Sequence, residues 1–271
     1  MDKNLVIILL VLSLFMGATI QYTYGSTLAG VLLFIVAIIL LFRMDIKRAP
    51  GDIKPRFYAV IGILIITFDA AYNYASLGRS GLNTLDSMVL LLGASLVARS
   101  IGIEQLRMVG TFGMYMSASF IALYATFYIL LGDFLYNFDH YFVMLPSAYL
   151  AKLAGVPIEI VARETIQIIG TNTNLILKIG GPCSGLYSMF LLIGIVVGYS
   201  MTEEMGDMKK IAKMAGVAAI VAYIANLIRV SILYVTGYLF GIDTMMSVHV
   251  HAGWILFAVT SIFLLSLLRR I

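Results

Sequence analysis

The stretch MAGVAAIVAYIANLIRVSILYVTGY, residues 214–238, carries a single charged side chain. About 20 apolar residues in a helix are enough to cross the hydrocarbon core of a bilayer, so this stretch predicts a transmembrane helix. Apolar runs of similar length recur along the whole chain of 271 residues. They are continuous, whereas the strands of an outer-membrane barrel alternate apolar and polar residues. The sequence therefore predicts an all-α polytopic membrane protein.

The composition agrees with this class. Hydrophobic residues make up 61% of the chain and charged residues 12%, and the mean hydropathy is +1.00. A soluble domain carries about twice that share of charge. The net charge of +4 requires no nucleic acid, and the single cysteine excludes a disulfide framework and a site built from several cysteines.

We predict about eight transmembrane helices in a single integral membrane domain that covers residues 1–271. Their approximate ranges are 4–20, 27–43, 57–76, 85–103, 108–131, 184–201, 214–238 and 248–268. The first predicted span, residues 4–20, resembles a secretory signal peptide. Further spans come at once without a convincing cleavage site, so we interpret it as a span.

Basic residues orient the predicted spans. The loop over residues 43–56 holds five of them and is expected in the cytoplasm. Counting spans from this loop brings three further basic clusters to the same side. These are Arg99 with Arg107, Lys209 and Lys210 with Lys213, and Arg269 with Arg270. Both termini are then cytoplasmic, and the segment 132–182 is extracytoplasmic.

The extracytoplasmic segment predicts a helix and a small β-element. Residues 140–154 are typical of an interfacial or re-entrant helix. Beyond them isoleucine and leucine alternate with other residues as far as Ile179, and the turn-like GTNTN, residues 170–174, separates two of these runs. We expect a hairpin-like β-element before the sixth span that delivers the chain to Cys183.

Cys183, the only cysteine, lies in the motif GGPCSGL, residues 180–186. Pro182 suits the first position of a helix, which predicts that Cys183 lies in the first turn of the sixth span. The free N–H groups of a helix start favour a thiolate there. A lone membrane cysteine is also commonly a small packing residue, and both interpretations stay open.

Arg229 is the only charged residue inside the seventh predicted span. An arginine at the centre of a membrane helix costs about 2.5–3.5 kcal/mol, and such charges usually mark functional sites. A structural arginine paired with an acid is the alternative. Asn226, three residues earlier, shares its helix face. Asp69 of the third span is predicted to lie at a membrane depth similar to that of Arg229, and we therefore expect an ion pair between them. A packing role for Asp69 near the membrane interface is the alternative.

Two histidines, His249 and His251, open the eighth predicted span. Because they are two residues apart, only one of them readily faces the interior of the bundle. A thiol, an imidazole and a guanidinium from three spans then map to the outer half of the membrane. They supply a nucleophile, a general acid/base and a cation for the oxyanion of acyl transfer, with no requirement for a metal or other cofactor.

These residues resemble the exosortase/archaeosortase family of polytopic cysteine enzymes, which process C-terminally anchored surface proteins. The family pattern is Cys-Ser-Gly-Leu, then Asn-x-x-Arg, then His-x-x-x-Gly. This chain has Cys183–Leu186, Asn226–Arg229 and His249–Gly253 in that order. The resemblance covers about residues 130–265, and the five N-terminal spans fit in number and hydropathy only.

The resemblance implies that Cys183 is the nucleophile, Arg229 the transition-state stabiliser and His249 the general acid/base. His249 is favoured over His251 because only His249 has a glycine, Gly253, four residues on. Some family members carry arginine where this chain has histidine. The supporting or substrate-binding candidates are Asn226, Ser184, Gly185, Asp69 and His251.

The implied substrates are membrane-anchored proteins that end in a recognition motif, a transmembrane segment and a few basic residues. The enzyme would cut them near the outer surface and pass the acyl group to a lipid-linked acceptor amine. Two other functions are weighed against this one. A transporter or channel would line its path with Arg229 and Asp69, although the sequence has no paired broken helices or inverted repeat. A simple membrane cysteine peptidase would release its product to water.

Overall fold

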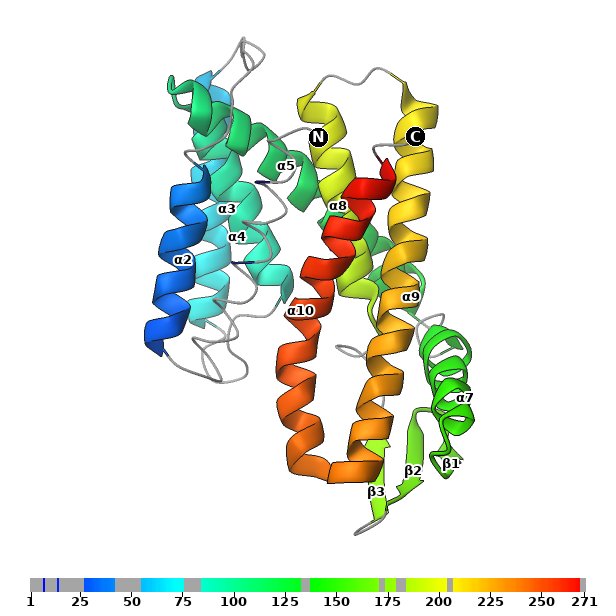
Figure 1. Cartoon of the computed structure of the whole chain (residues 1–271). Coiled ribbons are helices and arrows are strands. Elements are labelled where there is room, and N and C mark those ends of the chain that lie inside the picture. The colour runs from blue at the N-terminus through cyan, green and yellow to red at the C-terminus, as the bar shows by residue number, and fades with distance from the viewer. Residues whose placement is uncertain are drawn as a thin grey trace. The chain divides into compact units, whose positions relative to one another are not determined.

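The computed structural model describes residues 27–41, 55–75, 84–132, 137–170, 174–178, 184–203 and 207–268, together with Ile7 and Leu14. These residues are mostly helical and include one small sheet (Figure 1). The chain divides into two compact units, each assembled from separate stretches. Unit 1 comprises residues 1–43, 130–189 and 220–271, and unit 2 comprises residues 44–129 and 190–219. The single domain over residues 1–271 stays a prediction.

Seven of the eight predicted spans coincide with helices. The helices are α2 (Thr27–Leu41), α3 (Pro55–Ala75), α4 (Thr84–Ser100), α5 (Glu104–Tyr124), α8 (Leu186–Thr202), α9 (Met208–Phe240) and α10 (Ile242–Leu268). A six-residue π-helix, η1 (Ala125–Leu130), continues α5. The remaining predicted span, 4–20, lies outside the described residues apart from Ile7 and Leu14.

Three helices within the described ranges are long and apolar enough to cross a membrane. They are α3, α5 together with η1, and α9, while α8 is apolar but shorter. Large apolar side chains lie exposed along them, as Ile220, Ile224 and Ile228 do on one stripe of α9. Such a stripe suits contact with lipid. The helices support a membrane protein, and the number of crossings stays a prediction.

Unit 2 packs its helices closely at glycines. A Cβ atom on Gly62 of α3 would lie 2.6 Å from the carbonyl oxygen of Gly93 in α4. On α8, a Cβ atom on Gly194 would lie 2.7 Å from the carbonyl oxygen of Met116, and one on Gly198 would lie 2.9 Å from that of Phe112. Small residues let helix backbones approach in this way. The GIVVG sequence of residues 194–198 therefore forms a helix-packing face.

Unit 1 contains a helix and a sheet between α5 and α8. The helix begins as a π-helix, η2 (Asp139–Met144), and continues as α7 (Leu145–Leu153). The strands β1 (Ile158–Ala162), β2 (Thr165–Ile169) and β3 (Asn174–Lys178) pair antiparallel in the order β1-β2-β3. The predicted helix and β-element are confirmed, with a third strand added to the hairpin. Each of the three alternating runs forms one strand, and Ile158, Ile168 and Leu175 are buried, whereas Ile160 of β1 is exposed.

The buried faces of α7 and the sheet share a core with α9. Val230 and Tyr234 of α9 are both 2% exposed and belong to this core. Hydrogen bonds reinforce it, because the Ser147 hydroxyl donates to the Tyr234 hydroxyl at 3.5 Å and the Ser231 hydroxyl donates to the Ser147 carbonyl at 3.2 Å. The strand that leads towards Cys183 is therefore fixed to α9 beside Arg229.

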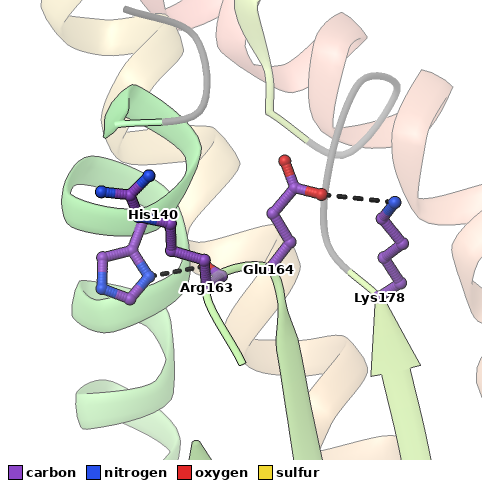
Figure 2. A network of polar contacts seen from close by, with 4 residues as sticks. All are labelled: His140, Arg163, Glu164 and Lys178. Carbon is purple, nitrogen blue, oxygen red and sulfur yellow. Dashed lines mark hydrogen bonds and ion pairs between the residues drawn. The ribbon is translucent and has the colours of Figure 1, made fainter. Parts of the chain in front are cut away.

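The turn between β1 and β2 is held by two polar contacts (Figure 2). Nδ1 of His140 in η2 lies 2.6 Å from the carbonyl oxygen of Arg163. Next to it the Glu164 carboxylate lies 3.4 Å from Nζ of Lys178 in β3. These contacts join the start of the helix, the turn and the last strand into one module.

Candidate active site

The turn between α9 and α10 sets the depth of the candidate residues. Gly241 alone separates the two helices and has φ +82°, in the left-handed region that glycine adopts readily. The sequence predicted a connection between spans that end near residue 238 and begin near residue 248, and most of this connection is helical, with one break at Gly241. His249 and His251 consequently lie about two turns inside α10 instead of at its outer end.

The two arms of this hairpin bring two motifs together. Arg229 lies 12 residues before Gly241 and Gly253 lies 12 residues after it. A Cβ atom on Gly253 would be 3.8 Å from Nη1 of Arg229, which is van der Waals contact. Nearer the turn, Gly237 and Met245 meet in the same register, at four residues from Gly241 on either side. Asn-x-x-Arg and His-x-x-x-Gly therefore meet because the two arms are equal in length.

His249 is the histidine associated with Arg229. Its side chain is half-buried. It lies one helical turn from Gly253, which contacts the same guanidinium. His251 is exposed. The choice of His249 over His251 as the general acid/base stays a prediction.

Asn226 connects the Asn-x-x-Arg motif to the Cys-Ser-Gly-Leu motif. It is 5% exposed and lies on the buried stripe of α9 with Ala222 and Val230. Gly185 packs directly against it, and a Cβ atom on Gly185 would lie within 2.6 Å of the Asn226 amide nitrogen. The three motifs thus converge in unit 1, and glycine at position 185 makes the close approach possible.

Helix α8 begins later than the sequence predicted. Gly185 has φ +77°, so a right-handed helix cannot run through it, and α8 starts at Leu186. The Leu186 N–H donates to the hydroxyl of Ser184 at 3.4 Å, and Ser184 is itself buried. The prediction that this helix begins at Pro182 is wrong. Cys183 lies outside the described residues, and its position relative to Arg229 and His249 stays a prediction.

Asp69 belongs to unit 2. It is 6% exposed, and the Asn73 amide donates to its carbonyl at 2.9 Å and to its carboxylate at 3.3 Å. Asn73 therefore shares the helix face of Asp69, as the spacing predicted. The ion pair of Asp69 with Arg229 joins residues of different units and stays a prediction.

Several residues that position this site were not predicted from the sequence. Ser147, Ser231 and Tyr234 fix α7 and the sheet to α9, and Gly241 sets the hairpin register. Serines and tyrosines in apolar helices give no specific signal. The equal distances of Arg229 and Gly253 from Gly241 were readable from the sequence, because glycine commonly ends a helix.

Gly185→Ala is expected to destabilise the protein. A left-handed backbone costs a residue with a Cβ atom about 1–2 kcal/mol, and the overlap with Asn226 adds about 1–3 kcal/mol. Thermal unfolding of the full chain in detergent should show a lower midpoint. Gly216→Ala on α9 is the control, because a Cβ atom there meets no heavy atom within 4 Å in the described structure. An unchanged midpoint for Gly185→Ala would contradict the close packing.

Comparison with known proteins identifies the family of the chain. Residues 21–266 match the transmembrane exosortase family. Neither a curated protein nor a solved structure matches the chain. The family match includes all three motifs and all the helices from α2 to α9. The chain therefore belongs to the transmembrane exosortase family.

Proposed function

We propose that this chain is a membrane cysteine transpeptidase that cleaves the C-terminal sorting signals of surface proteins. The convergence of three motifs in unit 1 carries this proposal. Gly185 packs against Asn226, Arg229 lies against Gly253, and His249 is one helical turn before Gly253 on α10. Membership of the exosortase family supports the same activity.

In the proposed reaction Cys183 attacks the scissile peptide bond. The His249 imidazole takes the thiol proton, and the sulfur forms a bond to the carbonyl carbon. The carbonyl π electrons move to oxygen and produce a tetrahedral oxyanion. The guanidinium of Arg229 stabilises this charge and stays protonated while doing so.

The second half of the reaction transfers the acyl group. The carbon–nitrogen bond breaks, His249 returns its proton to the leaving amine, and the transmembrane segment with its basic tail departs. A thioester on Cys183 remains. An acceptor amine, which we propose to be lipid-linked, attacks the thioester and releases the thiol. These steps require no metal or other cofactor.

The length of α9 supports a site near one face of the membrane. Its 33 residues extend over about 50 Å, whereas the hydrocarbon core is about 30 Å thick. Arg229 lies 11 residues, about 16 Å, from the end at Phe240. A guanidinium at that depth reaches the interface by snorkelling when this end projects from the core. The positive-inside rule assigns this face to the exterior and both termini to the cytoplasm.

Mass spectrometry of surface-protein C-termini tests the proposal. Cells that contain the chain should display surface proteins shortened at the C-terminus and joined to an added amine or lipid, and cells that lack it should retain the full tails. A free carboxylate at the new terminus would show that the chain hydrolyses its substrate and does not transfer the acyl group to an acceptor. Identical C-termini in both cells would contradict processing and favour a transport function.

A further inference from the structure

We propose that the open edge of β3 binds the substrate as an additional β-strand. This inference rests on the proposed function, since it concerns how the same site receives its polypeptide. An extended substrate segment would pair with Asn174–Lys178 and would then continue beside the chain that leads to Cys183. The backbone of β3, rather than a side-chain pocket, would align the segment.

The direction of the backbone groups in β2 is fixed by one hydrogen bond. The Ile169 N–H donates to the Pro157 carbonyl at 3.0 Å, so the backbone groups of Ile169 point towards β1. In an antiparallel ladder the N–H and C=O of one residue point to the same side, and successive residues alternate. The backbone groups of Ile168 and Ile166 therefore point towards β3.

The register then defines which groups of β3 face outward. Leu175 and Leu177 are paired with Ile168 and Ile166, so their N–H and C=O groups are bonded within the sheet. Asn174, Ile176 and Lys178 alternate with them. Their N–H and C=O groups point away from β2, and they form a row of donors and acceptors with the two-residue period of an extended chain.

This row is open along the described part of the chain. Among the described residues, the one polar contact of these three residues outside the ladder is the side-chain ion pair of Lys178 with Glu164 (Figure 2). Ile176, in the middle of the strand, is 70% exposed. The opposite edge differs, because β1 carries an irregularity between Ile160 and Ala162, and such bulges discourage strand pairing. The pairing of β3 is regular over all five of its residues.

The position of β3 in the chain indicates its occupant. Lys178 lies five residues before Cys183, a span of at most about 18 Å of extended chain. On the inner face of the strand, the Leu175 side chain lies 3.3 Å from the position of a Cβ atom on Gly237 of α9, the helix that carries Arg229. A strand added to this edge would therefore be bound to β3, which packs against the helix that carries Arg229. Backbone pairing accepts an extended polypeptide of varied sequence, which is the chemistry of the proposed substrate.

Photo-crosslinking from Ile176 identifies the occupant. The full chain carries a benzophenone amino acid at this position together with Cys183→Ala, so that bound substrate stays uncut. We expect adducts with the C-terminal region of proteins that also accumulate uncut in Cys183→Ala cells. The same probe in place of Val161, which is exposed on β1, should form no such adducts. Adducts with a second copy of this chain, adducts with lipid alone, or equal adducts from both positions would overturn the proposal.

Ile176→Pro provides a second test. It removes an outward N–H while the ladder with β2 keeps its bonds, a position where edge strands accept proline. Loss of one backbone hydrogen bond should slow processing about threefold to tenfold, and Ile176→Val, which keeps the N–H, should process faster than Ile176→Pro. Equal labelling of Cys183 by a maleimide in both variants would show that the site is intact. Wild-type processing by Ile176→Pro would refute the strand addition alone, whereas processing independent of Cys183 would refute the proposed function and this inference with it.

Discussion

Replacing Cys183 with alanine or serine is expected to abolish processing, with a loss of about 10³-fold or more. The sulfur forms the covalent bond of the proposed reaction, and no other cysteine is present to replace it. Serine is nearly the same size, but its hydroxyl is a far weaker nucleophile without activation. Cells with either variant should accumulate the full-length substrates identified by mass spectrometry. A transporter would tolerate both changes.

Ser184→Ala is the matched control for Cys183. The Ser184 hydroxyl accepts the Leu186 N–H at the start of α8 and is 3% exposed. Loss of such a contact costs about 1 kcal/mol of stability. Processing should therefore persist in this variant. If Cys183→Ala cells released mature surface proteins at the normal rate, the cysteine mechanism would be excluded.

Arg229→Gln is expected to lower kcat by about 10²–10³, because removal of one oxyanion donor has an effect of this size. The KM should change little, since the negative charge on the carbonyl oxygen exists only in the transition state. Arg229→Lys should recover part of the rate. Lysine keeps the charge but lacks the planar fork that lies against Gly253. Initial rates of the purified variants, with a substrate identified in cells, measure both constants.

Arg99→Lys is the matched control for Arg229. Arg99 is a buried arginine that stacks at 4.7 Å over the Tyr58 ring and contacts Met114, all within unit 2. Its replacement should lower the unfolding temperature without a specific effect on kcat. If Arg229→Gln lost only stability, and a second substitution Asp69→Asn restored it, Arg229 would be a structural partner of Asp69 instead.

Helices and strands were predictable where the apolar pattern is strong. Long apolar runs indicate helices, and α3, α5, α8 and α9 lie on such runs. Alternating isoleucines indicate strands, and the sheet forms where they occur. The ends of helices were not predictable from hydropathy. Asp243 interrupts the apolar run before His249, yet α10 already begins at Ile242 because Gly241 completes the turn.

The candidate site was predictable as residue types, and its contacts were not. Charge inside an apolar helix singled out Arg229, and motif spacing singled out Asn226 and His249 over His251. The contact of Gly185 with Asn226 depends on a left-handed backbone and on a packing distance, which a glycine in a sequence does not reveal. The later start of α8, at Leu186, follows from the same left-handed backbone of Gly185.

The one-residue turn at Gly241 also constrains how this chain can change in evolution. Inserting a single residue between Arg229 and Gly241 would rotate the guanidinium by about 100° around the axis of α9 and shift it by about 1.5 Å. Gly253, on the other arm, would stay in place. Insertions and deletions between Arg229 and Gly241 are therefore tolerable only when α10 gains or loses the same number of residues before Gly253, so the two segments must vary in length as a pair.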